Sequence, residues 1–503
     1  MLRSLRIISP SGFNRTRPRL FSSLRSLTEQ DVSHLASILP STPIISTFSP
    51  FNNSKDELDS FNTDWMKKYH GNSTTVVKPR STEEVSQIVH WCWENRVAIV
   101  PQGGNTGLVG GGVPLKDELV INLGNMNKIR SFDPVSGILV AESGCVLESL
   151  SEYLAPKGHI MPLDLGAKGS CQIGGNVSTN AGGLRLLRYG SLHGSVLGLE
   201  VVLPDGTILD QLSTVRKDNT GYDLKQLFIG AEGTLGIVTG VSILTPAAPK
   251  ALNNVLLAVP NFSKIIPIFR TVRAHTSEIL SAFEFFDRTA YEIVCRHGHR
   301  RPFQEDIGDA QCFILLETSG GRKEHDEEKL NDLLGTLMNS EENLITTGVL
   351  AQSPFQFASI WAMREGITEA LTKEGKTYKY DISIPSGSFK DVIDEIREHL
   401  RAQGVYPEGG VKAVLGYGHF GDGNLHLNVV TDGYSPKIAS AIEPRIYEIV
   451  SRYRGSISAE HGIGSHKTGV LHYSKGEVSR AWMKKIKDLF DERGIMNPGK
   501  VII

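Results

Sequence analysis

Short stretches of the chain alternate between hydrophobic and polar residues, and longer stretches repeat hydrophobic residues with helical spacing. The first clear example is a β-branched run at residues 75–77, followed by an amphipathic segment at 81–95 and an apolar run at 97–101. Ser81 occupies the position of a helix N-cap, and Glu84 stands where a capping box needs an acid. The pattern therefore predicts a strand–helix–strand unit with parallel strands.

The same patterns predict further elements up to residue 249. Asp205-Gly206 is a strong hairpin signal between two apolar runs. The other elements expected in this region are strands at 119–123, 129–133 and 138–142 and a helix at 146–154.

From residue 251 onward, predicted strands and helices interleave without glycine-rich loops, apart from one region near residue 420. This order of strands and helices favours a second, antiparallel α+β domain that covers the first. The expected strands are 254–259, 280–286, 310–318, 378–384 and 424–430, and the expected helices are 262–273, 290–296, 324–338, 355–374, 389–402, 439–453 and 478–492.

Composition places the chain among multidomain globular proteins. Its 503 residues are 40% hydrophobic, enough for two or three domains. The 53 basic and 55 acidic residues nearly balance, so charge gives no argument for nucleic acid or an anionic membrane as partner. The five cysteines are scattered and contain no CxxC pair, which indicates buried thiols in a reducing compartment. We expect no transmembrane segment, because no apolar run reaches the roughly 20 residues that span a bilayer.

The N-terminus differs from the rest of the chain. Residues 1–28 contain six arginines and several serines, and the first acid is Glu29. This composition is typical of a mitochondrial transit peptide, so we expect a location in the mitochondrial matrix. The sequence then divides into a lead-in helix and connector at 29–69, a first domain at 70–249, a substrate or cap domain at 250–455, and a C-terminal segment at 456–503.

Three glycine-rich segments mark the first predicted domain: Pro101–Gly112, Gly166–Gly183 and Leu227–Thr239. The first two carry six glycines each. Backbone N–H groups in such turns can surround a phosphate. The first segment is neither a GxGxxG fingerprint nor a Walker loop. Two phosphate-type loops fit a cofactor with two phosphates, whereas a flexible surface loop is the alternative for each one alone.

Two histidines and an acid–histidine pair stand in glycine-rich turns of the C-terminal half. His419 and His426 are separated by a turn that contains glycines, and Glu460-His461 follows about thirty residues later. Strand alternation points His426 and Asn428 to the same side. Two imidazoles and a carboxylate suit zinc with one position open. A structural histidine is the alternative for each residue alone, but the combination favours a metal or catalytic site.

These motifs together carry a family resemblance that runs from about residue 70 to residue 503. Residues 101–112, 166–183 and 230–239 resemble the FAD-binding domain of the vanillyl-alcohol oxidase/p-cresol methylhydroxylase superfamily. The pairing of 416–428 with 459–464, and the ending 495–500, resemble the C-terminal domain of FAD-linked oxidases. The resemblance implies an α+β fold: a two-subdomain FAD-binding domain, a cap domain with an antiparallel sheet, and C-terminal helices that pack back on the FAD domain.

Within the superfamily the chain most resembles the dehydrogenases of D-2-hydroxy acids. Some relatives attach FAD through a histidine in the first glycine loop, but residues 101–112 contain none, so we expect non-covalent FAD. The residues expected to contact FAD are Pro101, Gln102, Gly103, Gly104, Asn105, Thr106, Gly107, Gly169, Ser170, Gly174, Gly175, Asn176, Thr179, Asn180, Gly182, Gly183, Glu232, Gly233, Gly236, Ile237 and Asn497.

The same resemblance implies a zinc site, a base and a substrate site. It implies that His419, His426 and Glu460 bind zinc, and that His461 is the catalytic base and also contacts substrate. The remaining substrate-binding residues that it implies are Arg364, Thr368, Lys379 and Asn428. Arg364 and Thr368 are four residues apart in the predicted helix 355–374, so they should share one face.

The expected reaction is oxidation of a small 2-hydroxy acid, with the hydroxyl proton taken by His461 and the C2 hydride passed to flavin N5. Arg364 and Lys379 favour a dicarboxylate such as (R)-2-hydroxyglutarate, oxidised to 2-oxoglutarate, over D-lactate or another D-2-hydroxy acid. A transferase related to alkyl-glycerone-phosphate synthase and a non-enzymatic binding protein are the alternatives from other classes. The electron acceptor stays open among an electron-transfer flavoprotein, a quinone, cytochrome c and pyruvate, and a homodimer is compatible with the sequence.

Overall fold

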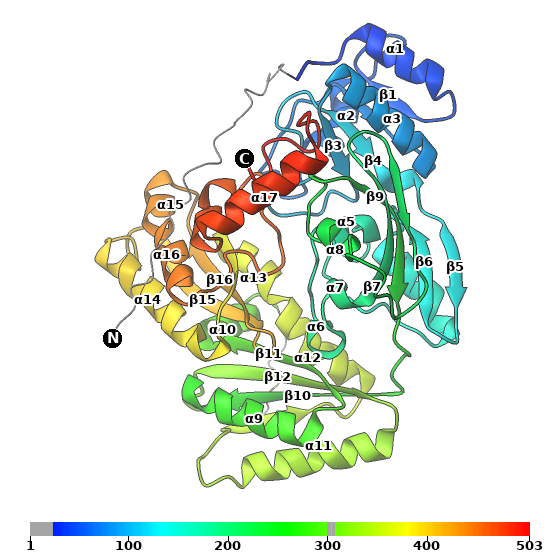
Figure 1. The fold of residues 1–503 in the computed structure, drawn as a ribbon. Coiled ribbons are helices and arrows are strands. Elements are labelled where there is room, and N and C mark those ends of the chain that lie inside the picture. The colour runs from blue at the N-terminus through cyan, green and yellow to red at the C-terminus, as the bar shows by residue number, and fades with distance from the viewer. Residues whose placement is uncertain (1–23, 299–302, 304–306) are drawn as a thin grey trace, which may run out of the picture.

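Three β-sheets organise the computed structural model, which describes residues 24–298, 303 and 307–503 (Figure 1). A four-stranded and a five-stranded sheet lie in the N-terminal half of the chain, and a seven-stranded sheet lies in the C-terminal half. The architecture is therefore α+β, with the two smaller sheets on one side of the molecule and the large sheet on the other.

The four-stranded sheet contains the predicted strand–helix–strand unit, with one difference. β2 (Thr75–Val77), α3 (Thr82–Asn95) and β3 (Ile99–Gln102) form as predicted. However, β4 (Leu119–Asn122) lies between β2 and β3 and runs parallel to both. β1 (Ile44–Ser46) pairs with the outer edge of β2. The parallel direction was predictable, but the insertion was not, because consecutive strands need not be neighbours in a sheet.

The five-stranded sheet is antiparallel and stands against α3. Gly206, in the turn of its predicted hairpin, has φ of +90°, and an added Cβ would lie 2.6 Å from His90 Cβ. Glycine therefore permits both the turn and the close contact with α3. In spatial order the strands are β5 (Ile129–Asp133), β6 (Ile138–Glu142), β9 (Ile237–Leu244), β7 (Val196–Val202) and β8 (Ile208–Gln211).

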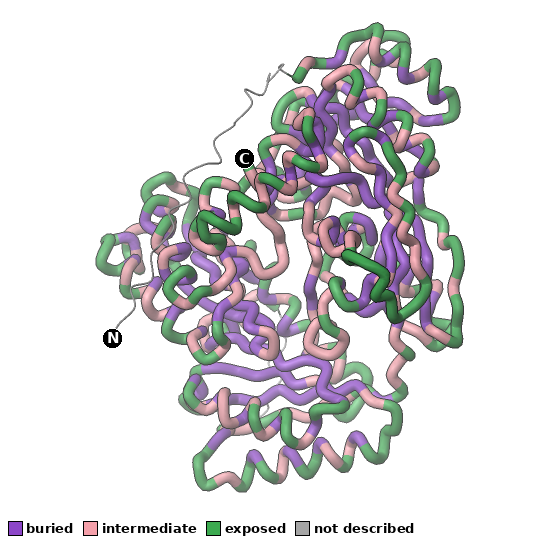
Figure 2. Tube along the Cα trace, in the orientation of Figure 1, coloured by how far each residue is buried: buried purple, intermediate pink, exposed green. Residues whose placement is uncertain are grey.

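The seven-stranded sheet is antiparallel throughout, as predicted for the second half of the chain. In spatial order its strands are β13 (Thr347–Leu350), β10 (Ala251–Val259), β12 (Cys312–Gly320), β11 (Leu280–Asp287), β15 (Val411–His419), β16 (Asn424–Thr431) and β14 (Lys376–Ser383). The central strands are buried, β13 at one edge is not, and the helices that cover the sheet are partly exposed (Figure 2).

Helices cover both faces of this sheet because successive side chains of each strand point to opposite faces, and both faces carry apolar side chains. One set packs with α9 (Ile265–Thr276), α11 (Lys323–Met338), α14 (Phe389–Ala402) and α16 (Arg445–Arg452). The other packs with α10 (Arg288–Arg296), α12 (Pro354–Glu365) and α13 (Ile367–Glu374). The α12 side also carries the polar residues of the candidate site.

Two helices that the sequence predicts as continuous are each broken in two. The predicted helix 355–374 ends at Glu365, and a second helix starts after Gly366, a residue with low helix propensity. The predicted helix 439–453 divides into α15 (Pro436–Ile442) and α16 because Pro444 cannot continue a helix. The prediction that Arg364 and Thr368 share the face of a single helix is therefore wrong.

The C-terminal segment returns to the N-terminal sheets, as predicted (Figure 1). Phe490 at the end of α17 (Glu477–Phe490) packs edge-on against Phe228 with ring centroids 5.6 Å apart. Ile99 N donates to Ile495 O at 2.8 Å, and one parallel β-bridge forms between β3 and the C-terminal segment. The chain end is thus tied to the strand that precedes the first glycine-rich segment.

Residues 1–23 of the predicted transit peptide lie outside the described residues. Residues 24–28 are described and join the fold: Arg25 Nη1 lies 2.6 Å from Asp31 Oδ2, and Leu27 is buried. The other helices are α1 (Glu29–Ile38), α2 (Lys55–Asn62), α4 (Leu147–Leu154), α5 (Ile173–Ser178), α6 (Leu186–Tyr189), α7 (Leu192–Ser195) and α8 (Lys225–Phe228). Among the helices of the described ranges, none combines the length and apolar character needed to cross a bilayer.

Candidate active site

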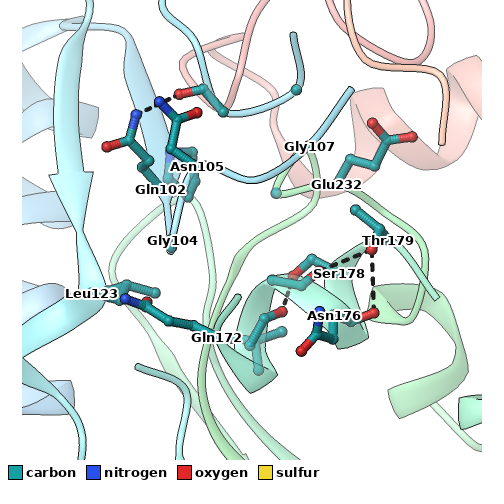
Figure 3. Close-up of a pocket in the computed structure, with 18 of the residues that line it drawn as sticks. Gln102, Gly104, Asn105, Gly107, Leu123, Gln172, Asn176, Ser178, Thr179 and Glu232 are labelled. Carbon is teal, nitrogen blue, oxygen red and sulfur yellow. Dashed lines mark hydrogen bonds between the residues drawn. The ribbon is translucent and has the colours of Figure 1, made fainter. Parts of the chain in front are cut away.

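The three glycine-rich segments meet around one cleft, with about 950 Å³ of space between its walls, part of it open to solvent (Figure 3). Gln102 and Asn105 stand on one wall, and Asn176 and Thr179 stand on the opposite wall. Fifteen of the residues predicted to contact FAD line the cleft: Pro101, Gln102, Gly103, Gly104, Asn105, Thr106, Gly107, Gly174, Gly175, Asn176, Thr179, Glu232, Gly233, Gly236 and Ile237.

The glycines of the cleft serve two different purposes. A Cβ on Gly104 would lie 2.0 Å from Ser170 O, and one on Gly174 would lie 2.5 Å from Ser143 Cβ. These two glycines let the segments approach one another. In contrast, a Cβ on Gly107 or Gly175 would meet no atom of another described segment within 4 Å. Glycine at those two positions leaves open space beside the cleft, as a bound ligand would require.

Four of the predicted FAD-contacting residues adopt left-handed backbone conformations without being glycine. They are Asn105, Asn180, Glu232 and Asn497, with φ between +44° and +53°. Asparagine tolerates this conformation, but glutamate rarely adopts it. The Glu232 carboxylate is held by Ile463 N at 2.7 Å and Gly464 N at 2.8 Å. Glu232 therefore connects the third glycine-rich segment to the turn that carries Glu460 and His461.

Several buried polar atoms in the cleft lack a partner. Ser143 Oγ, Gln172 Oε1 and Asn176 Oδ1 are inaccessible to solvent and make no hydrogen bond within the part of the chain that the structure describes. Leaving a buried polar group unpaired costs free energy, so these atoms suit a polar ligand. Open space beside two glycines and unpaired polar atoms together fit a dinucleotide cofactor such as FAD.

The two predicted histidine ligands and Glu460 lie together where β15 turns into β16. His419 ends β15, His426 stands in β16, and their ring centroids are 5.4 Å apart at 80°. Glu460 Oε1 lies 3.8 Å from His419 Nε2. One ligand atom from each of the three residues falls within a 4.8 Å group, so they form a candidate metal cluster.

A buried carboxylate stands behind each of the two histidines. His419 Nδ1 donates to Glu284 Oε1 at 2.9 Å, and His426 Nδ1 lies 3.6 Å from Asp381 Oδ1. Each imidazole therefore has Nδ1 directed to an acid and Nε2 left for another partner. This is the usual arrangement behind histidine ligands of metals.

The charges around the cluster are set by burial and by these pairs. Burial lowers the pKa of the His419 imidazole, but the Glu284 carboxylate outweighs burial and raises it to about 9. Burial raises the pKa of the Glu284 and Asp381 carboxyl groups. The cations beside Glu284 and the histidines beside Asp381 outweigh burial, so the pKa of each carboxyl group lies below its ordinary value. For His426, burial is the larger effect and the pKa falls well below its ordinary value. Two ionised carboxylates thus lie behind the ligand atoms, where a metal cation is favoured.

Asp381 also fixes the turn that carries the predicted base. Its Oδ2 accepts hydrogen bonds from Glu460 N at 2.8 Å and His461 N at 3.0 Å. On the other side of the turn, Gly183 N donates to Glu460 Oε1 at 2.7 Å, and a Cβ on Gly182 would approach the same oxygen. Gly182 and Gly183, predicted to contact FAD, therefore lie against Glu460.

His461 lies between the cleft and the cluster. It lines the cleft, while its neighbour Glu460 belongs to the cluster. Its Nδ1 is 3.5 Å from Asp381 Oδ2. The six other predicted FAD-contacting residues do not line the cleft: Gly169, Ser170, Asn180, Gly182, Gly183 and Asn497. Asn497 supports it from behind, since its Nδ2 donates to Glu232 O at 2.8 Å.

The predicted substrate-binding residues gather around Tyr417 on the α12 side of the sheet. Arg364 places its guanidinium carbon 4.9 Å from the centre of the Tyr417 ring, and Thr368 Oγ1 lies 2.9 Å from the Tyr417 hydroxyl. The two residues thus converge on one side chain although they belong to different helices. Lys379 pairs directly with Asn428 across β14 and β16. Burial lowers the pKa of the Lys379 ammonium group.

Sequence reasoning missed three residues of this site: Glu284, Asp381 and Tyr417. Each is buried within a strand, and the two acids stand between apolar or aromatic neighbours, Glu284 between Phe283 and Phe285 and Asp381 between Tyr380 and Ile382. A carboxylate at such a position is rarely tolerated without a partner, so that contrast was the available signal. Their partners come from distant parts of the chain, which the sequence does not bring together.

The family comparisons agree with this geometry. Residues 73–211 match the FAD binding domain family, and residues 248–501 match the family described as FAD linked oxidases, C-terminal domain. The chain belongs to the FAD-linked oxidase family and is a flavoprotein oxidoreductase. The predicted family is thereby confirmed.

Particular relatives share most of the chain's length. The mitochondrial D-2-hydroxyglutarate dehydrogenase of Arabidopsis thaliana is 50% identical over 97% of this chain and 83% of its own. That of Danio rerio is 48% identical over 98% of this chain and 89% of its own. The D-2-hydroxyglutarate–pyruvate transhydrogenase of Saccharomyces cerevisiae is 46% identical over 95% of this chain and 96% of its own.

Solved structures confirm the predicted fold class. 4-Ethylphenol oxidase from Gulosibacter chungangensis superposes with a TM-score of 0.69 at 16% identity, covering 94% of this chain and 97% of that one. p-Cresol methylhydroxylase superposes with a TM-score of 0.68 at 16% identity, covering 93% of this chain and 95% of that one. At these identities the likeness concerns the fold.

Proposed function

We propose that the protein oxidises (R)-2-hydroxyglutarate to 2-oxoglutarate with non-covalent FAD and zinc. The observation that carries the proposal is the place of His461, which lines the cofactor cleft directly beside the cluster member Glu460. The names of several relatives include D-2-hydroxyglutarate dehydrogenase, which supports the substrate.

In this proposal zinc is held by His419, His426 and Glu460. Two nitrogen donors and one oxygen donor suit zinc and leave a position for substrate. When bound, zinc supplies a Lewis acid and FAD supplies a hydride acceptor. Glu284 and Asp381 keep the Nε2 atoms of the two histidines available by engaging their Nδ1 atoms.

His461 is proposed as the catalytic base. Oxidation removes one proton and one hydride from the hydroxy acid, and the imidazole accepts the hydroxyl proton. The positive charge that the ring then gains is stabilised by Asp381, whose Oδ2 lies 3.5 Å from His461 Nδ1. Because Asp381 also accepts the His461 backbone hydrogen bond, ring and backbone are fixed by one carboxylate.

A dicarboxylate is favoured by the two cations beside the cluster. Arg364 offers a planar fork and Lys379 a point charge, and both lie on the α12 side of the sheet. Thr368 and Asn428 supply neutral donors at the same place, and the buried Asn428 Oδ1 has no hydrogen-bond partner among the described residues. A monocarboxylate such as D-lactate could bring its single carboxylate to only one of these cations, and of the two only Arg364 is already paired with an acid of the described ranges, Glu284. D-Lactate stays the second candidate, because a relative from Schizosaccharomyces pombe, 47% identical, is named as a putative D-lactate dehydrogenase.

The proposal extends to the setting of the enzyme. The relatives' names support a mitochondrial location, and we place the protein in the matrix. An electron-transfer flavoprotein is the proposed acceptor, with pyruvate as an alternative supported by the named transhydrogenase relative. The proposed domains are 29–69, 70–249, 250–455 and 456–503, preceded by the transit peptide at 1–28.

A panel of D- and L-2-hydroxy acids tests the proposal. The purified protein, loaded with FAD and zinc, is assayed with an artificial electron acceptor, with and without a zinc chelator. We expect turnover of D-2-hydroxyglutarate well above that of D-lactate, none of the L acids, and loss of activity with the chelator. Higher activity with D-lactate would overturn the substrate, and full activity in the chelator would overturn the role of zinc.

A further inference from the structure

We infer that Glu284 is a positioning residue that couples the metal site to the substrate arginine through a single buried carboxylate. Its Oε1 accepts from His419 Nδ1 at 2.9 Å. Its Oε2 accepts from Arg364 Nε at 3.1 Å and lies 2.8 Å from Arg364 Nη2. The inference rests on the proposed function, because it takes His419 as a metal ligand and Arg364 as a substrate contact.

The position of Glu284 leaves it little freedom. It stands in the middle of β11, directly opposite His419 of β15, and its side chain is 2% exposed. The strand residues on either side, Phe283 and Phe285, point into the core of the opposite sheet face. A buried carboxylate is costly unless it is paired and hydrogen-bonded, and here both oxygens are engaged by site residues.

Each of the two contacts determines the orientation of a different group. The His419 contact fixes the imidazole with Nε2 directed towards Glu460, 3.8 Å away. The Arg364 contact is a hydrogen bond from Nε together with an ion pair at Nη2. Among the described residues the buried Nη2 has no hydrogen-bond acceptor, so a substrate carboxylate would meet the terminal nitrogens of the guanidinium. Movement of the carboxylate towards one partner draws it from the other, so metal affinity and substrate affinity should depend on each other through Glu284.

Arg364 is also held from a second direction. Its guanidinium carbon lies 4.9 Å from the centre of the Tyr417 ring, and Tyr417 pairs with His426 across β15 and β16. Arg364 is therefore held on one side by Glu284, which orients the candidate ligand His419. On the other side it is held by Tyr417, which pairs with the candidate ligand His426. This arrangement is specific to an arginine, because a lysine cannot both form the fork and stack.

The test measures metal affinity and substrate affinity separately in Glu284→Gln. For the flavin-loaded protein, competition with a chromophoric chelator gives the zinc dissociation constant without turnover. We expect zinc binding to weaken about 10- to 100-fold, as for other residues behind metal ligands. At saturating zinc, KM for D-2-hydroxyglutarate should rise by more than kcat falls, while flavin content stays at one per chain.

Glu317→Gln is the matched control. Glu317 is a second buried glutamate of the same sheet, in β12, and accepts from Ser281 Oγ and Trp361 Nε1. It should leave zinc affinity and KM at wild-type values. If Glu284→Gln does not fold, Glu284→Asp is used instead, because it keeps the charge and shortens the side chain. It should raise both the zinc dissociation constant and KM.

A double-mutant cycle isolates the coupling. Without substrate, Arg364→Met should change the zinc dissociation constant roughly threefold or more in the wild-type background and not in the Glu284→Gln background. Equal effects in both backgrounds, or wild-type zinc affinity in Glu284→Gln, would overturn the inference. Because these measurements need no turnover, they remain decisive even if no 2-hydroxy acid is oxidised, a result that would count against the proposed function instead.

Discussion

Asp381 Oδ2 accepts hydrogen bonds from both the Glu460 and the His461 backbone N atoms, at 2.8 and 3.0 Å. The candidate metal ligand and the proposed base are consecutive in sequence, and this one carboxylate fixes both. Asp381 belongs to β14 of the large sheet, whereas the turn it holds leads back to the N-terminal sheets. The relative position of cleft and cluster therefore depends on a contact that no local sequence pattern indicates.

Replacing Asp381 with asparagine should disable turnover without releasing the flavin. The amide oxygen can still accept both backbone hydrogen bonds, but the change removes the negative charge that faces His426 and His461. We expect kcat or zinc affinity to fall about 10- to 100-fold, measured by steady-state kinetics and by bound zinc. Asp432→Asn, at an exposed position just after β16, is the control and should behave as wild type. A fully active Asp381→Asn would contradict this role.

Substrate binding should weaken at alkaline pH through Lys379. Burial lowers the pKa of this ammonium below its ordinary value, so its charge is lost as pH rises through the lowered pKa. KM for a diacid should therefore increase at a lower pH than an exposed lysine would give. Lys379→Arg keeps its charge over the same range and should show no such increase. Identical pH profiles of KM in the two proteins would count against a role of Lys379 in binding.

Two glycines of the first segment should respond differently to alanine. Gly104→Ala places a Cβ 2.0 Å from Ser170 O, so the two segments must separate, at a cost of about 1–3 kcal/mol in stability. Gly107→Ala meets no atom of another described segment within 4 Å, so the apoprotein should melt as the wild type does. Thermal melts of the apoproteins and flavin titration check both. Equal destabilisation by the two changes would refute the distinction.

Lys487 should be among the most important residues for attaching the C-terminal segment. It is 8% exposed, donates to Thr234 O and Met496 O at 2.7 Å, and pairs with Asp491. Lys487→Met leaves a buried carboxylate unpaired, which should cost about 3–5 kcal/mol. The control Lys484→Met removes a surface ion pair in which the lysine side chain is 45% exposed, and it should cost at most about 1 kcal/mol of stability. Chemical denaturation monitored by tryptophan fluorescence separates these outcomes.

The sequence predicts much of the site because its local signals are strong. Glycine-rich turns after strands predict the cleft, and strand alternation places His426 and Asn428 on one side of β16. The spacing of these motifs also identifies the family. Such signals come from backbone requirements that act over a few residues.

The residues that the sequence does not predict are those that depend on long-range pairing. Glu284 reaches His419 across 135 positions, and Asp381 reaches Glu460 across 79 positions. The insertion of β4 between β2 and β3 is likewise decided by sheet assembly. The helix break at Gly366 could have been predicted from the glycine itself, but a single glycine within a helical pattern is often tolerated.

Anaerobic reduction of the flavin tests the central claim most directly. The protein, loaded with FAD and zinc, is mixed with D-2-hydroxyglutarate without any electron acceptor, and the visible flavin absorbance is followed. We predict that the D enantiomer bleaches the oxidised flavin, that the L enantiomer does not, and that 2-oxoglutarate appears in equal amount to the flavin reduced. A protein that takes up no FAD, or whose bound flavin stays oxidised with the D enantiomer, would contradict the account.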